Sequence, residues 1–345
     1  MDRRLTTLAC CILATLPAAG QTSGKEPPYR VVFYNVENLF DPRDDPATRD
    51  DDFTPEGTRH WTWTRYNKKL LNISRALLLA GGQTPPLLIG LAEVENRRVL
   101  LDLTRRTTLA RADYGIVHAD SPDPRGIDVA LLYRREHFRP LAEAFLPVRL
   151  GKSEPSRDIL YCKGILHETD TLHLFVCHFP SMVGGVRASE WKRVAAATIL
   201  LRHLDSIRRE NPRTALIVMG DLNGPPGTLA QRRLGAKPAA ARHPSSNALY
   251  NTAYHYRRAA TGSYRYRGKW QTLDHILVSG SLLNGNFPWQ TPSRMSILAD
   301  ETLLDDDKTH YGQKPFPTYH GRRYAGGYSD HLPVHVELTP APPSG

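Results

Sequence analysis

The sequence predicts an α/β fold whose sheets are mixed rather than purely parallel. Short apolar runs that end in polar residues alternate with longer segments whose apolar residues have helical spacing. Two of the runs, within residues 159–179, lie close enough together to form an antiparallel hairpin, which argues against a purely parallel sheet. The sequence shows no internal repeat, low-complexity run or linker, so we expect a single folded domain.

The individual elements follow from these patterns in chain order. Residues 29–36 (YRVVFYNV) predict a strand, and the acidic, proline-bearing residues 41–57 predict a loop. Threonines then precede apolar spacing typical of a helix that ends near Leu79. Further helices are expected within 95–111 and from about 189 to 209, and further strands within 85–95, 127–136, 214–221, 272–279 and 332–338.

The first twenty residues have the features of an export signal. Arg3 and Arg4 precede an apolar stretch, Leu5 to Leu16, that is too short to span a bilayer, and small residues follow at 17–20. We therefore predict a signal peptide over 1–20 and a single mature domain over 21–345, periplasmic or secreted, with no transmembrane segment after cleavage. Cys10 lies in a lipobox-like TLAC, and lipid anchoring there is the alternative.

Two cysteines, Cys162 and Cys177, remain after that cleavage and flank the predicted hairpin. A two-residue turn at Thr169 and Asp170 would place them directly opposite each other. In an oxidising compartment such a pair could form a cross-strand disulfide, whereas two buried thiols acting as small hydrophobic side chains are the alternative.

Polar residues gather where the apolar strands begin or end. Residues two apart on a strand share one face, and ligand sites of α/β proteins lie where strand ends converge. Each cluster alone has a structural explanation, such as a turn, a helix cap or a buried histidine. Their recurrence along one chain favours a common site; the clusters are Asn35–Glu37, Glu93–Glu95, Asp221–Asn223, Asp274–His275, Asp330–His331 and His178.

The residue types in these clusters indicate a chemistry. Carboxylate and amide oxygens with no cysteine thiolate among them suit a hard divalent cation such as Mg²⁺, Mn²⁺ or Ca²⁺. The histidines are then available to donate hydrogen bonds to a phosphate or to act as general acid or base. The formal net charge of +10 favours polyanionic partners, although a well-charged soluble surface explains it equally.

Seven segments occur in a fixed order along nearly the whole mature chain: FYNVENLFD, GLAEVEN, RGIDVALLY, HFPS, GDLN, LDHILVS and SDHLPV. Together they resemble the endonuclease/exonuclease/phosphatase superfamily, which includes the deoxyribonucleases. The resemblance is strongest to an exported bacterial branch of it. This resemblance implies a four-layer sandwich, in which two mixed β-sheets pack face to face and helices flank them. It places the active site at one edge of the sheets.

The resemblance also implies roles at the matching positions. Glu93 would be the main metal ligand, with Asn35, Glu37 and Asp330 close to the metal. Glu95 has no clear counterpart.

The catalytic positions carry over in the same way. His331 would be the general acid or base, with its tautomer fixed by Asp274. Asp221 would orient or deprotonate the attacking water. The phosphate itself would be contacted by Asn223, His178, Arg125 and Asp128.

The function implied is an exported, divalent-metal-dependent phosphoesterase, an endonuclease that cuts DNA or RNA by in-line attack of an activated water. The alternatives are a phosphatase or a phospholipid phosphodiesterase of the same superfamily, and a non-catalytic binding protein on the same scaffold. Arginines and aromatic residues interleave over 254–270, which suits a nucleic-acid groove, but an ordinary hairpin with solvated arginines gives the same pattern.

The sequence departs from the family pattern at two positions. Gly224 follows GDLN where exported relatives carry aspartate, and His275 follows Asp274 where other members carry tyrosine or glutamine. Both departures are expected to bear on substrate fit.

Overall fold

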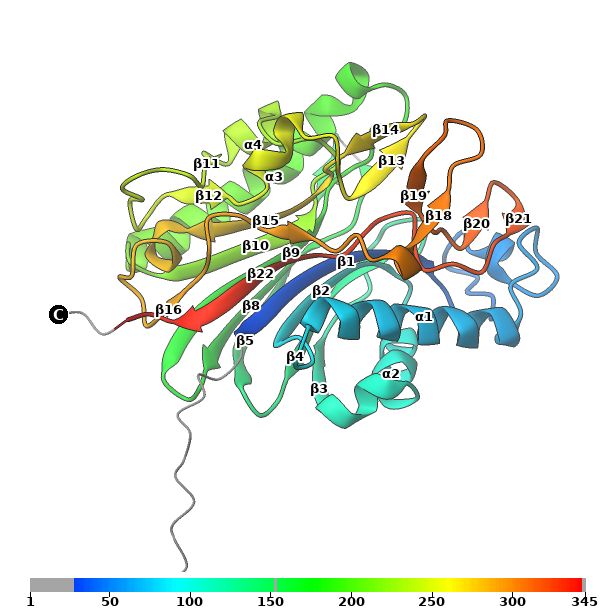
Figure 1. Cartoon of the computed structure of the whole chain (residues 1–345), viewed down its shortest axis with the longest axis horizontal. Coiled ribbons are helices and arrows are strands. Elements are labelled where there is room, and N and C mark those ends of the chain that lie inside the picture. Colours follow the sequence, from blue (N-terminus) through cyan, green and yellow to red (C-terminus); the bar gives the residue numbers. More distant parts are fainter. Residues whose placement is uncertain (1–27, 152–153, 343–345) are drawn as a thin grey trace, which may run out of the picture.

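The computed structural model describes residues 28–151 and 154–342, and within them the strands form two large mixed sheets (Figure 1). The first has the order β16-β22-β1-β2-β4-β3, with β17 also paired to β22. The parallel pair β1–β2 lies at its centre, and the neighbouring pairs are antiparallel. The strands are β1 (Tyr29–Leu39), β2 (Leu88–Val94), β3 (Tyr114–Val117), β4 (Asp128–Arg134), β16 (Trp289–Gln290), β17 (Ser296–Ile297) and β22 (Val334–Pro340).

The second sheet has the order β11-β12-β15-β10-β9-β8-β5. Its β9–β10 and β11–β12 pairs are parallel and the others antiparallel. The strands are β5 (Phe138–Leu146), β8 (Ile159–Leu166), β9 (Asp170–His178), β10 (Ala215–Asp221), β11 (Lys237–Pro238), β12 (Leu249–Asn251) and β15 (Asp274–Ser279).

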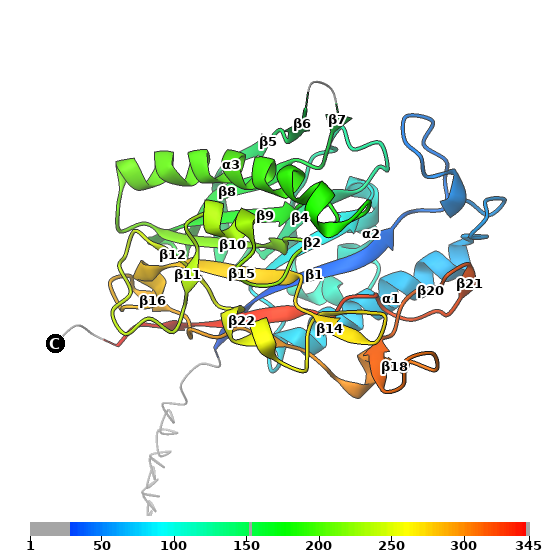
Figure 2. The same cartoon turned by 90° about the horizontal axis from the view of Figure 1, so that it is seen from above.

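Helices cover the outer face of each sheet (Figures 1 and 2). Helices α1 (Trp63–Gly81) and α2 (Arg97–Arg105) pack on the first sheet, and α3 (Val186–Glu210) and α4 (Leu229–Arg233) on the second. Among the described residues, none of the helices combines the length and the apolar character that a membrane crossing requires.

Short elements occupy the loops. The 3₁₀ turns are η1 (Asp51–Phe53), η2 (Thr108–Ala112), η3 (Tyr254–Arg258), η4 (Gly280–Leu282) and η5 (Glu301–Leu303). The small strand pairs are β6 (Arg149–Leu150) with β7 (Glu154–Pro155), β13 (Tyr264–Tyr266) with β14 (Lys269–Gln271), β18 (Leu304–Asp306) with β19 (Gln313–Pro315), and β20 (Tyr319–His320) with β21 (Arg323–Tyr324).

The period-2 alternation of β1 shows why the layers form. Val31 and Phe33 face the core between the two sheets, whereas Val32 and Tyr34 face the core beneath α1. Because β1 is apolar on both faces, it is buried on both, as a central strand requires. The four-layer sandwich predicted from the sequence is confirmed.

The predicted register of the β8–β9 hairpin is wrong. The turn has three residues, because Leu166 pairs with Asp170, and Cys162 therefore pairs with Leu174. Cys162 faces the core between the sheets and Cys177 faces the core beneath α3. An odd register shift moves a side chain to the other face of a sheet, so the two cysteines are separate, buried free thiols and not a disulfide.

Other sequence predictions differ in extent. The segment predicted as one helix over 95–111 is a helix, α2, followed by the turn η2, and strands β3 and β5 were not predicted. The interleaved segment 254–270 is not one hairpin, because its first part is the turn η3. The predicted signal peptide, 1–20, and Cys10 lie outside the described residues.

Candidate active site

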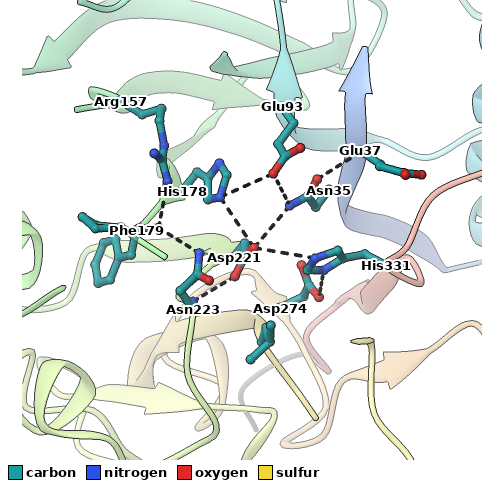
Figure 3. Close-up of polar contacts among 12 residues, drawn as sticks. Asn35, Glu37, Glu93, Arg157, His178, Phe179, Asp221, Asn223, Asp274 and His331 are labelled. Carbon is teal, nitrogen blue, oxygen red and sulfur yellow. Dashed lines mark hydrogen bonds and ion pairs between the residues drawn. The ribbon is translucent and has the colours of Figure 1, made fainter. Parts of the chain in front are cut away.

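The ends of three neighbouring strands of the second sheet place a histidine and two aspartates in one row. Asp221, at the end of β10, pairs with His178 of β9 on one side and with Asp274 of β15 on the other. The first sheet brings Asn35 from β1 and Glu93 from β2 to the same place, and His331 enters from the loop before β22 (Figure 3). The site therefore lies at one edge of both sheets.

Backbone irregularities turn the first sheet's side chains toward this edge. The β1–β2 pairing jumps from Asn35–Ala92 to Leu39–Val94, and the φ angle of Glu93 is +64°. Glu93 thereby reaches β1: its Oε1 accepts from Asn35 Nδ2 at 3.4 Å, and its Oε2 from the backbone N–H of Asn38 at 3.0 Å. Bulges and positive φ angles at non-glycine residues concentrate at functional sites, where they aim side chains.

His331 and Asp274 form a hydrogen-bonded dyad. Nδ1 of His331 lies 2.8 Å from Oδ2 of Asp274, which is fully buried. Burial by itself lowers the pKa of His331, but the hydrogen bond and charge of Asp274, together with Asp330 and Asp221, raise it well above its ordinary value. The imidazole is therefore held as a cation, with Nε2 left to face the cavity.

Asp221 is the buried carboxylate at the centre of the row. Its Oδ2 accepts from Asn35 Nδ2 at 3.2 Å and lies 3.9 Å from His331 Nε2. Its Oδ1 accepts from the backbone N–H of Asn223 at 2.8 Å. Burial, followed by the charge of Asp274, raises the pKa of Asp221 to about 7, which suits a group that must accept a proton near neutral pH.

His178 is the neutral histidine of the site. Its Nε2 lies 3.6 Å from Asp221 Oδ2 and 3.9 Å from Glu93 Oε1. Burial, and after it the charges of Arg157 and Arg125, hold the pKa of His178 well below its ordinary value. Among the described residues no hydrogen-bond partner reaches its buried Nδ1.

These side chains line a cavity of about 580 Å³. Asn223, whose φ is +48°, lines it while its amide donates to the backbone oxygen of Phe179 at 2.9 Å. Asn35 and Asp274 lie beneath the lining and support it. The predicted residues among the lining are Glu93, Arg125, His178, Asp221, Asn223, Asp330 and His331.

Two predicted residues point elsewhere. The side chain of Glu37 extends away from Glu93 (Figure 3), accepts from the backbone N–H of Thr318 at 2.6 Å and lies 3.8 Å from Nζ of Lys69. It lines a separate cavity of about 120 Å³. Asp128 accepts from the backbone N–H of Ser121 at 2.9 Å and does not line the active-site cavity.

The two departures from the family pattern meet in one buried contact. Nε2 of His275 lies 2.9 Å from the backbone oxygen of Gly224. A Cβ at position 224 would lie 2.9 Å from Cγ2 of Thr228, so a larger residue there would require a shift of that side chain. Neither residue lines the active-site cavity.

Three supporting residues were not predicted from the sequence. The ring of Tyr264 packs on the imidazole of His331 at 4.8 Å between centroids. The hydroxyl of Ser329 donates to the backbone oxygen of Asn35 at 2.7 Å and accepts from the backbone N–H of His331 at 3.1 Å. Lys69 is buried on the apolar face of α1. A lysine among the apolar positions of a predicted helix is unusual, and this is the signal that could have identified it from the sequence.

The donor set fits a hard divalent cation. Glu93, Asp221 and Asp330 supply carboxylate oxygens to one cavity. Burial, with the charge of Glu37 next, raises the pKa of Asp330 to about 7, which is the mark of crowded carboxylates that a cation would neutralise.

Among the described residues, Asp221, Asp274 and His331 place one potential ligand atom each within 4.8 Å of the others, whereas Glu93 and Asp330 belong to no such group of three. The Nδ1 of His331 is used by Asp274, however, and a protonated imidazole cannot bind a metal. Glu93 and Asp330 are therefore the cavity carboxylates that remain as candidate cation ligands.

Comparison with known proteins agrees with this geometry. A model of the Endonuclease/Exonuclease/phosphatase family matches residues 30–340. The chain belongs to this family. Its members are phosphoester hydrolases that generally depend on a divalent metal ion, so the chain is a phosphoesterase by family.

Solved structures share the fold. The mannosyl-6-phosphatase of Bacteroides thetaiotaomicron VPI-5482 is 17% identical, with a TM-score of 0.56, 90% of this chain covered and 99% of that one. D. rerio TDP2 complexed with a single-strand DNA product is 14% identical, with a TM-score of 0.54, 90% of this chain covered and 98% of that one. The human Nocturnin catalytic domain with bound sulfate is 18% identical, with a TM-score of 0.53, 90% of this chain covered and 94% of that one. No curated protein matches this chain significantly.

Proposed function

We propose that this family member is an exported phosphodiesterase that hydrolyses the backbone of DNA or RNA with a divalent cation, Mg²⁺ before Mn²⁺ or Ca²⁺. The observation that carries the proposal is the row His178–Asp221–Asp274 together with His331, because it places a proton acceptor and a proton donor at one cavity. Pairs of titratable groups whose pKa values are shifted by their surroundings are typical of acid–base catalysis.

Asp221 acts as the base in this proposal. Its pKa of about 7 lets the carboxylate take a proton from the attacking water near neutral pH. The backbone N–H of Asn223 and the amide of Asn35 hold the two carboxylate oxygens in place. The water is thereby activated on the floor of the cavity.

His331 acts on the phosphate. The imidazolium, oriented by Asp274, donates from Nε2 to a phosphate oxygen and stabilises the negative charge that develops in the transition state. His178 and Asn223 lie on the other side of Asp221 from His331 and offer further hydrogen-bond donors (Figure 3). A cation bound by Glu93 and Asp330, with Asn35 near it, would supply Lewis-acid stabilisation of the same charge.

Nucleic acid is supported by charge and by surroundings. The formal net charge is +10, and Tyr264 and Tyr266 line the cavity beside the exposed Arg267. D. rerio TDP2, whose structure has a similar fold, was solved in complex with a single-strand DNA product. Arg265 does not contribute, because its guanidinium lies 3.6 Å from Asp307 and donates to the oxygens of Gln313 and Tyr311.

A phospholipid phosphodiesterase is the second candidate. Val183 and Val186 are 85% and 59% exposed, and both line the rim of the cavity, as an enzyme that engages an apolar substrate requires. Export, proposed from residues 1–20, is compatible with both candidates.

The test is hydrolysis by purified residues 21–345 of supercoiled plasmid, structured RNA, sphingomyelin and an inositol polyphosphate, each with Mg²⁺ and with a chelator. We expect chelator-sensitive cleavage of a nucleic acid, absent in a His331→Gln variant. Release of phosphocholine or phosphate with both nucleic acids intact would overturn the proposed substrate. Recovery of the protein from the cytoplasm with its first twenty residues intact would contradict export.

A further inference from the structure

The active-site cavity is much larger than a phosphate group requires. Its volume of about 580 Å³ lies in the range of about 300–1,000 Å³ that holds a small organic ligand. The acidic and imidazole groups described above form its floor. Among the described residues, Arg125 is the only arginine or lysine in the lining, so the remaining space is not built for a second phosphate.

One wall of this space is apolar and exposed. Met182 and Val183 come from the loop that leads into α3, and Val186 is the first residue of that helix. Gly184 and Gly185 in that loop have φ angles of +84° and +111°, a conformation that only glycine adopts readily. Because Val183 is 85% exposed at this bend, its side chain is free to contact a ligand rather than used by the core.

A second part of the lining is aromatic and has polar edges. Tyr264 and Tyr266 line it from β13, and Gln271 lines it from β14, opposite Tyr264 in the hairpin. The guanidinium of Arg267 lies 5.3 Å from the ring centroid of Tyr266. The wall therefore combines a flat stacking surface with an amide that can both donate and accept hydrogen bonds.

We propose that the space between the apolar wall (Met182, Val183 and Val186) and the aromatic wall (Tyr264, Tyr266 and Gln271) is a subsite for the nucleobase next to the scissile phosphate. This inference rests on the proposed function. A base presents two flat faces and a polar edge, which match tyrosine, valine and glutamine in turn. The subsite would make the enzyme select nucleotide esters over phosphate esters that lack a base.

A lipid acyl chain fits the same space less well. Burying the amide of Gln271 against a hydrocarbon chain would leave its donors and acceptor without partners. A base edge supplies those partners, and the charge of Arg267 beside the subsite favours a polyanionic strand that continues past it.

The kinetic test compares two esters that release the same leaving group, the p-nitrophenyl ester of thymidine 5′-monophosphate and methyl p-nitrophenyl phosphate. We expect Tyr266→Ala and Val183→Ser to lower kcat/KM for the thymidine ester about tenfold, mainly through KM, and to change the methyl ester less than about twofold. Tyr311→Ala and Leu141→Ser are matched controls, since these side chains are 84% and 47% exposed and do not line the cavity.

Two results would overturn the subsite: an equal loss on both esters, or no loss on the thymidine ester. A binding measurement separates this from failure of the proposed function. In saturation-transfer NMR with thymidine 5′-monophosphate and a chelator, the base protons of the ligand should receive saturation from wild type and much less from the Tyr266→Ala variant. Absence of transfer to the base in wild type would refute the subsite whatever the enzyme hydrolyses. A preference for phosphocholine esters would refute it in favour of lipid.

Discussion

The chain contains the dipeptide Asp-His twice, and the two histidines lie in different surroundings. In Asp330–His331 both side chains line the active-site cavity. In Asp274–His275 the aspartate supports His331, but His275 is buried away from the cavity, where Nδ1 lies 3.2 Å from the amide of Asn251 and Nε2 lies 2.9 Å from the oxygen of Gly224. Burial lowers the pKa of His275 to about 4, whereas that of His331 is raised well above its ordinary value.

The backbone explains the difference. Asp274 and His275 lie within β15, where successive side chains point to opposite faces, so only the aspartate can reach the site. Asp330 and His331 precede β22, and the hydroxyl of Ser329 holds this loop. Without strand alternation, both neighbours can face one cavity. The same dipeptide therefore places its histidine at the cavity or in the buried interior according to the conformation of its backbone.

The largest expected effect comes from His331. In a His331→Gln variant the cation beside Asp274 is lost, and we expect kcat to fall by about 10³-fold or more. The melting temperature should also fall, because the variant leaves the buried carboxylate of Asp274 without its cation, so the rate is compared per folded molecule. Single-turnover rates and thermal unfolding of the same preparation check this. Near-normal turnover would show that the two histidines do not differ as proposed.

A smaller effect is expected from Glu93, which we compare with its neighbour Glu95. In Glu93→Gln the concentration of Mg²⁺ needed for half-maximal binding should rise about 10- to 100-fold, measured by calorimetry without substrate. Glu95→Gln is the matched control: burial raises the pKa of Glu95 to about 8, its Oε2 accepts from the backbone N–H of Asp41 at 2.6 Å, and it does not line the cavity. Equal metal affinities in the two variants would remove Glu93 from the cation site.

Lys69 is expected to matter less, through the loop that carries His331. Its Nζ donates to the backbone oxygen of Tyr328 at 2.7 Å and lies 3.8 Å from Glu37. Lys69→Met removes this support, so we expect kcat to fall about tenfold with KM nearly unchanged, while Lys68→Met, which alters an exposed neighbour, should behave as wild type. A loss of stability without a change in kcat would make Lys69 purely structural.

Much of the site could be predicted because strand ends converge. The positions of Asn35, Asp221 and Asp274 follow from apolar runs that end in polar residues at one edge of a sandwich. The orientation of Glu37 could not be predicted, since its φ of +52° takes it out of strand alternation. Strand alternation predicts that Glu37 shares a face with Asn35, but the bulge turns its side chain toward Lys69.

The hairpin register failed for a related reason. His167 and Glu168 adopt φ angles of +46° and +67° in a three-residue turn, although neither is glycine or asparagine, so the composition gave no sign of the turn's length. One added turn residue moved Cys162 and Cys177 to opposite faces. Composition fixes which segments are strands more securely than it fixes their pairing.

The smallest effect on turnover, and a measurable effect on stability, is expected from His275→Gln. Because the folded pKa of His275 is about 4 and the unfolded value is about 6.5, its contribution to stability is fully present above pH 6.5 and is lost as the pH falls toward 4. Glutamine does not titrate, so the variant should be less stable than wild type by about 1–3 kcal/mol at pH 7.5, with a smaller difference at pH 5.

Urea unfolding at both pH values, with kcat measured per folded molecule, tests this expectation. His173 and His335, whose pKa values burial also lowers to about 4, keep a similar acid sensitivity in both proteins and provide the internal reference. A variant with unaltered stability but impaired turnover would place His275 in the catalytic machinery. The contrast between the two Asp-His pairs would then be one of degree, because a residue on the far side of β15 would be acting on the cavity through Asp274.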